Sequence, residues 1–460
     1  MGDQQTNWTK EVDVVVLGSG AAGLIAALSA HQHGAGEVLI IEKSGMVGGT
    51  SAMSGGMMWI PMNHHAVEDG IEDNIDDVVT YLDAMAPERL DPETVGAYLE
   101  SGPEMIRFIA DHTPAKLRHF RGFPDYQPWL EGSLHNGGRS LDNDVFPFET
   151  LGSAATRVNP PKTGVPKLTS RMEDKYGGVT PEMLEDRKRR DCRGQGQALI
   201  GSLLKGVLDR NIPLHRESRA GHLITEGRRV IGVETEENGK QLRIRARKGV
   251  IIATGGFEWN EKLVHSFLRG PMTGPVSVPE CEGDGLLMAM EVGASLGNMG
   301  KSWWLQSSQE MAAQGRGFAN YLIGNSERTR PRSILVNRDA KRVVNEATNY
   351  NAIANQHGFV VAYPEGIDFS WADGRGASVP DRQGVDDVGF LVADRLLGGP
   401  GKPMPAGRVV TEIEISLMKT IVIDDAKFQP PGTPARVNAA TDFAVQLESL
   451  NGTFVERKGG

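Results

Sequence analysis

The stretch that most constrains the fold is Gly18–Gly23, "GSGAAG", with glycine at its first, third and sixth positions. It follows Val12–Leu17, "VDVVVL", a short β-branched run that favours a buried parallel strand. The next residues, Ala21–His33, read as a helix that Gly34 ends. A second apolar run, Glu37–Glu42, predicts another strand. The order strand, glycine turn, helix and strand predicts a βαβ unit that binds a dinucleotide.

Each glycine of the turn has a physical role in such a unit. Gly18 allows the tight turn, Gly20 lets the backbone approach a pyrophosphate, and Gly23 permits close contact between helix and strand. The helix begins at Ala21 and Ala22, so its free N–H groups and the positive end of its dipole favour phosphate there. These five residues are the predicted pyrophosphate site.

Glu42 is the acid at the end of the second predicted strand. Its carboxylate is placed to accept hydrogen bonds from an adenosine ribose. The alternative interpretation is that Glu42 is a solvated acid at the end of the strand. The residues after it are small and let a large ligand approach the backbone closely. The further predicted cofactor-binding residues here are Lys43, Gly48, Gly49, Thr50, Ser51, Ser54, Gly55 and Gly56. The apolar run "MMWIPMN" that follows favours a ligand-binding wall over a flexible surface turn.

Three later segments add to this pattern. The alternating residues around Asn238-Gly239 predict a β-hairpin in the region of about 215–250. The run "VIIATGG" predicts an apolar strand with a second close-approach turn at Ala253, Thr254, Gly255 and Gly256. Asp284 opens a predicted helix, where it could cap N–H groups or reach a ligand.

Composition excludes several other classes of protein. The 460 residues predict two or three domains, and a net charge of −10 argues against nucleic-acid binding. The basic run Glu185–Arg193 is predicted to be a solvated helix face. Cys192 and Cys281 are isolated, which predicts a reduced, cytoplasmic protein, and the histidines of Asn63–His65 are predicted to lie in a loop and bind no metal. The sequence has no continuous apolar run of about 18 residues, so we predict no integral membrane span.

The segment Glu42–Pro61, "EKSGMVGGTSAMSGGMMWIP", resembles the fumarate reductase/succinate dehydrogenase flavoprotein superfamily. The likeness is strongest to its 3-ketosteroid 1-dehydrogenase branch and covers residues 10–356. Further segments resemble the same family in the same order: Gly194–Leu214, Ala246–Asn260, Gly283–Met299 and Arg332–Tyr350. The resemblance implies FAD as the cofactor. It also implies an α/β fold, in which a Rossmann-like FAD-binding domain carries an inserted α+β substrate (cap) domain.

The resemblance implies an order of domains as well. The FAD-binding domain would span residues 1–275 and the substrate (cap) domain residues 276–460, with an atypical sequence after about residue 357. The family's later segments, which return the chain to the FAD-binding domain, are not recognisable here. We therefore expect the segment that closes the flavin site to be missing.

The implied activity is 1,2-dehydrogenation of a 3-ketosteroid or similar small hydrophobic cyclic ketone. A hydride would pass to flavin N5, a tyrosine would assist proton abstraction, and an unidentified external acceptor would take the electrons. Tyr126, in Phe120–Leu141, and Tyr321 match the family's two active-site tyrosines. The alternative for each is a half-buried aromatic ring with a hydrogen-bonded hydroxyl.

Two other functions stay open. Fumarate reductases carry an arginine proton donor where this chain has Thr329, which Arg328 and Arg330 flank and Arg332 follows closely. A flavin ene-reductase like fumarate reductase is therefore the first alternative. A catalytically incomplete FAD-binding remnant is the second, because the closing segment is not recognisable.

Overall fold

The computed structural model describes residues 7–86, 90–161, 164–268, 275, 277–300 and 302, together with the backbone of residues 410–415 and 419–424. The chain divides into two compact units. The first comprises Met1–Phe257 and Glu280–Asn298, and the second comprises Glu258–Pro279 and Met299–Gly460. The domain limits at 275 and 276 stay a prediction.

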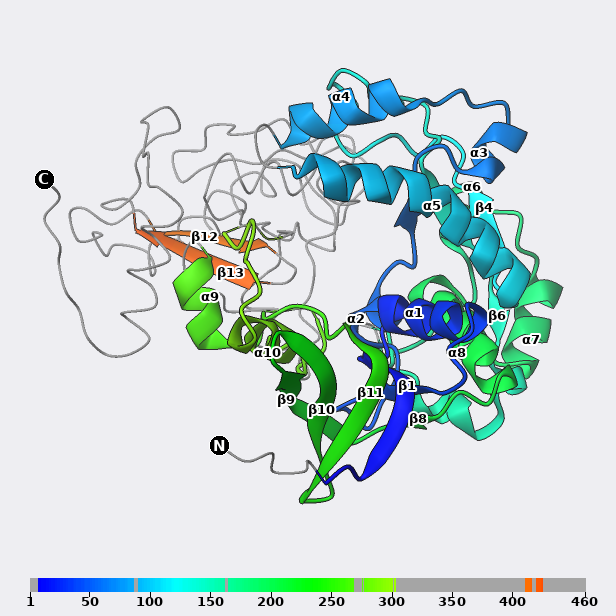
Figure 1. The fold of residues 1–460 in the computed structure, drawn as a ribbon. Coiled ribbons are helices and arrows are strands. Elements are labelled where there is room, and N and C mark those ends of the chain that lie inside the picture. The colour runs from blue at the N-terminus through cyan, green and yellow to red at the C-terminus, as the bar shows by residue number, and fades with distance from the viewer. Residues whose placement is uncertain are drawn as a thin grey trace, which may run out of the picture. The chain divides into compact units, whose positions relative to one another are not determined.

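A six-stranded sheet organises the first unit (Figure 1). Four neighbouring strands are parallel, and two antiparallel strands extend the sheet at one edge. The strand order is β8 (Leu214–His215), β2 (Val38–Ile41), β1 (Lys10–Leu17), β11 (Lys240–Ile252), β10 (Arg229–Glu237) and β9 (Ser218–Glu226).

The opening βαβ unit forms as predicted. Strand β1 pairs in parallel with β2, from Val14 opposite Val38 to Leu17 opposite Ile41. Helix α1 (Ala21–Gln32) connects them, with Gly20 as its N-cap. All four residues of β2 are buried, which explains its unbroken apolar sequence.

The predicted hairpin is also confirmed. Glu237 pairs with Lys240 across a two-residue turn, in which Asn238 and Gly239 have φ values of 51° and 73°. Positive φ at both positions is typical of the hairpin turn that Asn-Gly favours. Strand β11 continues past the hairpin and pairs in parallel with β1, where Val250 lies opposite Val15. One strand of 13 residues therefore joins the hairpin to the predicted "VIIATGG" strand.

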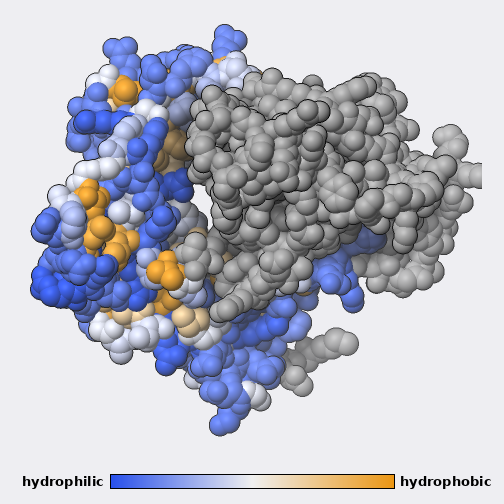
Figure 2. Space-filling view, turned by 180° about the vertical axis from the view of Figure 1, so that it is seen from behind, coloured by the Kyte–Doolittle hydropathy of each residue, from blue (hydrophilic) through white to orange (hydrophobic). Residues whose placement is uncertain are grey.

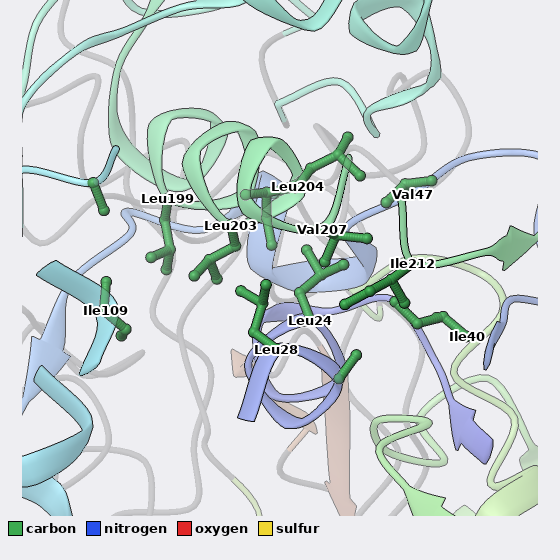
Figure 3. Close-up of a cluster of buried hydrophobic side chains, with 14 of the residues drawn as sticks. Leu24, Leu28, Ile40, Val47, Ile109, Leu199, Leu203, Leu204, Val207 and Ile212 are labelled. Carbon is green, nitrogen blue, oxygen red and sulfur yellow. The ribbon is translucent and has the colours of Figure 1, made fainter. Parts of the chain in front are cut away.

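Helix α8 (Gln195–Asp209) packs on α1 to form the main apolar core of this unit. Figure 3 shows Leu24 and Leu28 of α1 directed toward Leu203 and Val207 of α8. All four side chains are fully buried. The core therefore fixes α1, and with it the glycine turn at its N-terminus.

Short elements complete the first unit. A three-stranded sheet has the order β3 (Met58–Trp59), β5 (Ser140–Asn143) and β4 (Leu117–His119). The other strands pair as β6 (Phe146–Pro147) with β7 (Cys192–Arg193). The remaining helices are α2 (Gly49–Met53), α3 (His64–Glu68), α4 (Ile75–Met85), α5 (Pro92–His112), η1 (Phe148–Arg157), α6 (Arg171–Tyr176), α7 (Pro181–Arg189) and α10 (Asp284–Glu291).

Two surface predictions can be compared with these elements. Residues 185–189 of the basic run form the second half of α7, which has no buried residue, so the solvated helix face is confirmed for that part. The run then leaves the helix, and Cys192 is buried in β7. The predicted loop at Asn63–His65 is wrong, because both histidines begin α3 and the Asn63 side chain caps it by accepting from Ala66 N. Within the described residues, no group of three or more His, Cys, Asp or Glu side chains could hold a metal ion.

In the second unit, the described residues form one helix and one hairpin. Helix α9 (Glu261–Phe267) is capped by the Asn260 side chain, which accepts from Leu263 N. Trp259, which precedes α9, donates from Nε1 to Ser277 O at 3.2 Å. This hydrogen bond joins the two chain segments on either side of the helix. Strands β12 (Val410–Ile415) and β13 (Lys419–Asp424) pair antiparallel.

The described surface is largely hydrophilic in the view of Figure 2, where apolar residues form small separate groups. Among the described helices, none has the length and apolar character needed to cross a membrane. Cys192 and Cys281 are both buried.

We predict that Leu28→Ala lowers the free energy of unfolding by about 2–5 kcal/mol, because it leaves a cavity between α1 and α8. Urea denaturation followed by circular dichroism measures the change. Leu208→Ala is the matched control, since Leu208 lies on α8 but is 39% exposed, and a change within about 0.5 kcal/mol is expected. Equal losses in both variants would contradict the proposed role of the α1–α8 contact.

Candidate functional site

Ser19 joins the two glycine-rich segments. Its side chain is fully buried, and its backbone N and its Oγ both donate to Glu42 Oε2, at 3.0 and 2.6 Å. Ser19 Oγ also accepts from Gly48 N at 3.2 Å. The Glu42 carboxylate therefore holds the turn after β1 at the end of β2, and Ser19 Oγ joins this turn to the start of the second glycine segment.

Glu42 has protein partners on both of its oxygens. Oε1 accepts from Ser44 N at 2.9 Å, in addition to the two bonds from Ser19 to Oε2. A carboxylate has roughly four acceptor positions, so about one is left for a ribose hydroxyl. Ribose binding by Glu42 stays a prediction, and the structure adds a second role for this acid within the protein.

Close packing requires glycine at two positions of the turn. Gly18 has φ +102°, and a Cβ atom there would lie 2.3 Å from Ala253 O. At Gly23 a Cβ atom would lie 2.0 Å from Gly18 O. The turn is thus pressed between α1 and the end of β11, where Ala253 N donates to Leu17 O at 2.8 Å. This geometry agrees with the roles predicted for both glycines.

The N-terminus of α1 is open toward the second segment. Its N-cap Gly20 makes no side-chain cap bond, and the nearest atom to a Cβ built on Gly20 is Ser51 Oγ at 3.7 Å. Ser51 Oγ accepts from Ala21 N at 3.3 Å, and Ala22 is exposed. Gly49, on the same short helix as Ser51, also lies near Gly20, with 3.9 Å between a Cβ built on Gly49 and the Gly20 Cα. Side chains at these glycines would fill the cradle above the helix.

The second segment contains the short helix α2, whose backbone is held by α8. Gly196 N donates to Ser54 O at 3.1 Å, and Gln197 Nε2 donates to Ala52 O at 3.1 Å. A Cβ at Gly196 would lie 2.3 Å from Ser51 O, so only glycine allows this approach. Ser54 Oγ donates to Ser51 O at 2.8 Å and ends the helix. Thr50 lies on α2, with its Oγ1 3.6 Å from Cys281 Sγ.

The residues after α2 are held from a different direction. Gly56 has φ +69°, and its carbonyl accepts from Asn143 Nδ2 at 2.6 Å. A Cβ at Gly55 would lie 2.7 Å from Arg171 Nη1. Both predicted cofactor-binding glycines therefore lie in a close-packed turn between β5 and α6.

The turn at Ala253–Gly256 is joined to α10. Thr254 Oγ1 accepts from Gly285 N at 3.2 Å, and Gly256 O accepts from Gly283 N at 3.0 Å. Gly255 has φ +78°, and a Cβ there would lie 3.3 Å from Cys281 Sγ. This turn therefore meets the first turn through Ala253 and the α10 segment through its other three residues.

Lys43 and Asp284 form part of an ion-pair cluster. Lys43 Nζ lies 2.8 Å from both Glu282 Oε2 and Asp284 Oδ2, and Asp284 Oδ1 accepts from Arg219 Nη2 at 2.6 Å. Gly283 is the N-cap of α10, and no side chain caps the helix there. Asp284 thus directs both oxygens at cations, and these pairs tie the end of β2 to α10. Contact of either residue with a cofactor stays a prediction.

The segment around Tyr126 is anchored on both sides of this residue. Asp125 Oδ1 accepts from Trp59 Nε1 at 2.7 Å, and Asp125 Oδ2 accepts from Arg139 Nη1 at 2.7 Å. On the other side, Gln127 N donates to the Tyr81 hydroxyl at 2.9 Å. Tyr126 is half-buried between these anchors.

Arg139 is the charged centre of this arrangement. Its side chain is fully buried, and its guanidinium binds Asp73 through Nε and Nη2 as well as Asp125 through Nη1. Burial alone lowers the pKa of Arg139, but the bonds and charges of the two carboxylates outweigh it and raise the pKa above its ordinary value. The guanidinium carbon lies 5.8 and 5.7 Å from the ring centres of Trp59 and Tyr81. Burial raises the pKa of Tyr81 to about 12.

The predicted site residues therefore fall into three groups. The glycine segments, Glu42 and the Ala253–Gly256 turn come together around the N-terminus of α1. Tyr126 is linked to the second glycine segment through Trp59, which follows Gly56 by three residues. Tyr321, Thr329 and the three nearby arginines, Arg328, Arg330 and Arg332, lie outside the described residues.

The sequence reasoning missed two residues that organise the site. Ser19 occupies a variable position of the glycine motif, and only its side-chain bonds reveal its role. Arg139 lies in a polar stretch, where nothing in the local pattern marks it as buried. A possible signal was the set of acids at Asp73 and Asp125, but their pairing with Arg139 is non-local.

The residues around α1 fit FAD. The cradle above the α1 N-terminus has free space where Cβ atoms of other residues would stand, and helix N–H groups suit a pyrophosphate. Glu42 retains an acceptor position for a ribose hydroxyl, and the second glycine segment continues from the same cradle. The geometry around the α1 N-terminus therefore suits the dinucleotide end of FAD.

Comparison with known proteins places this chain in a family. The model of the FAD binding domain family matches residues 13–380. The chain is 36% identical to 4-oxocyclohexanecarboxylate 2-dehydrogenase of Sinomonas cyclohexanicum over 353 residues, which is 74% of this chain and 60% of that protein. It is 36% identical to 3-oxosteroid 1-dehydrogenase of Mycobacterium tuberculosis over 371 residues, or 74% of this chain and 63% of the relative. The chain thus spans less than two thirds of the length of these curated relatives.

The fold of this chain is similar to that of a solved crystal structure. The structure of 3-ketosteroid Δ1-dehydrogenase from Sterolibacterium denitrificans in complex with 1,4-androstadiene-3,17-dione has a TM-score of 0.68 and 31% identity. The match covers 76% of this chain and 67% of that structure, and it confirms the predicted fold class. The match over residues 13–380 shows that the chain belongs to the FAD binding domain family, with FAD as the cofactor of its fold.

Proposed function

We propose that this protein is an FAD-dependent dehydrogenase that introduces a C=C bond beside the carbonyl group of a cyclic ketone, such as a 3-ketosteroid. The observation that carries the proposal is the bond from Trp59 Nε1 to Asp125 Oδ1 at 2.7 Å. It ties the wall that follows the second glycine segment to the residue before Tyr126. Relatives named for oxidation of cyclic ketones support the same reaction class.

The reaction needs two hydrogens to leave neighbouring carbons. A proton leaves the carbon beside the ketone, a hydride leaves the adjoining carbon, and the electron pair of the first C–H bond forms the C=C bond. FAD supplies the hydride acceptor, at flavin N5, when it is bound. In this proposal Tyr126 is an active-site hydroxyl near the substrate and Tyr321 is the base that removes the proton.

A substrate panel tests the proposed reaction and separates it from both alternatives. We expect the purified protein to reduce an artificial acceptor dye when given 4-androstene-3,17-dione or 4-oxocyclohexanecarboxylate. Oxidation of reduced viologen with fumarate, and no dye reduction, would instead indicate an ene-reductase. A yellow protein that is inactive in both assays would indicate a catalytically incomplete FAD-binding remnant.

We predict that Gly18→Ala abolishes or strongly reduces FAD binding, because the added Cβ would meet Ala253 O at 2.3 Å. The visible flavin absorbance of the purified variant, before and after added FAD, measures the loss. Gly34→Ala is the matched control, since Gly34 also has a positive φ, +86°, but a Cβ there meets no atom within 4 Å. Full flavin content in Gly18→Ala would refute the assignment of this turn.

We predict that Tyr126→Phe lowers kcat by about 10²–10⁴-fold while the flavin content stays unchanged, as expected for a hydroxyl that assists the proton abstraction by Tyr321. Steady-state dye assays with the better ketone measure the effect. Tyr176→Phe is the control, because the Tyr176 hydroxyl donates to Arg121 O on an exposed surface. A wild-type kcat in Tyr126→Phe would remove this residue from the mechanism.

A further inference from the structure

We propose that Arg139, Tyr81 and Trp59 are positioning residues that set the place of Tyr126 in the dehydrogenation. The inference rests on the proposed function, since it assigns these three residues a role in the same reaction. None of them needs to touch the substrate. They act through the two neighbours of Tyr126 in the chain, Asp125 and Gln127.

The first step is that both neighbours of Tyr126 are fixed by side chains. Asp125 receives bonds on both carboxylate oxygens, from Trp59 Nε1 and Arg139 Nη1, and Leu134 N also donates to its Oδ2 at 2.9 Å. Gln127 N donates to the Tyr81 hydroxyl at 2.9 Å. Consecutive Cα atoms are about 3.8 Å apart, so anchors on both sides leave the backbone of Tyr126 little freedom to move.

The second step is that these anchors form one cluster. Arg139 binds the carboxylates of Asp73 and Asp125 with different edges of one planar group. The same group lies 5.8 and 5.7 Å from the rings of Trp59 and Tyr81, whose centroids are 6.0 Å apart. Lysine could not replace it, because an ammonium group lacks the fixed fork that spans two carboxylates. A shift of one member therefore shifts the anchors on both sides of Tyr126.

The cluster around Arg139 is charged although it is buried. The Arg139 side chain is fully buried. Its two partners are buried as well, with side-chain exposures of 4% for Asp73 and 1% for Asp125. Apolar side chains of similar volume are often as good or better for stability at such places. Directional bonds instead determine one orientation, and here the oriented element is the turn that presents Tyr126.

A positioning role predicts a specific kinetic result. Tyr81→Phe keeps the ring and removes the hydroxyl that accepts from Gln127 N. We expect kcat to fall about 10- to 100-fold with little change in KM, because a small displacement of a reacting group acts on the transition state. Flavin content should match the wild type, since within the described part of the chain no hydrogen bond joins Tyr81 to the residues around the α1 N-terminus.

The deciding experiment is a double-mutant cycle with Tyr81→Phe and Tyr126→Phe in the dye assay. If Tyr81 acts through Tyr126, its substitution should lower kcat in the wild-type background and have almost no further effect in Tyr126→Phe. Tyr176→Phe serves as the matched control, with no effect expected in either background. Equal effects of Tyr81→Phe in both backgrounds, or no effect in the wild type, would overturn the positioning role.

Two measurements keep the test decisive. If Tyr81→Phe does not yield folded, yellow protein, Trp59→Phe replaces it in the cycle, since it removes the Nε1 donor on the opposite side of Tyr126. Inactivity of the wild-type protein with both ketones would contradict the proposed function itself. An active wild type with an additive cycle would contradict only the positioning role.

Discussion

The buried bonds between Ser19 and Glu42 are the interaction on which the cofactor half of the site depends. A hydrogen bond to a charged group contributes about 1.5–3 kcal/mol, and Glu42 accepts three from the protein. These bonds hold the turn after β1 against the end of β2, while Gly48 N on Ser19 Oγ brings in the second segment. Glu42 thus holds Ser19 in the place from which Ser19 Oγ accepts from the second glycine segment.

Glycine contributes to this arrangement because it has no Cβ atom. At Gly18, Gly23 and Gly196 an added Cβ would lie within 2.3 Å of a carbonyl oxygen. The backbones of β11, α1, α2 and α8 can therefore meet at contact distance around the N-terminus of α1. Side-chain hydrogen bonds fix the position of each segment, and the glycines set how closely the segments approach.

This difference explains how far the sequence could predict the structure. The glycine spacing, the apolar strands and the Asn238-Gly239 turn are local patterns, and β1, α1, β2 and the hairpin form where those patterns indicate. The short helix α3 was missed, because its cap at Asn63 depends on one side-chain bond that a pair of histidines does not suggest. Arg139 could not be found either, since its partners Asp73 and Asp125 are 66 and 14 residues away.

The glycine segments and the segment around Tyr126 are thus held by different kinds of interaction, and Trp59 links them. The cofactor half is made of backbone and small side chains, because a long ligand must lie close to the chain. The segment around Tyr126 is held by buried charge and aromatic rings, which suits the positioning role proposed for them. Trp59 follows Gly56 in sequence, pairs with Ser140 in the β3–β5 ladder, and donates to Asp125. In the described part of the chain, the side chains that hold Asp125 and Gln127 are Trp59, Tyr81 and Arg139, and all three lie in the first unit, in the segment that follows the second glycine-rich stretch.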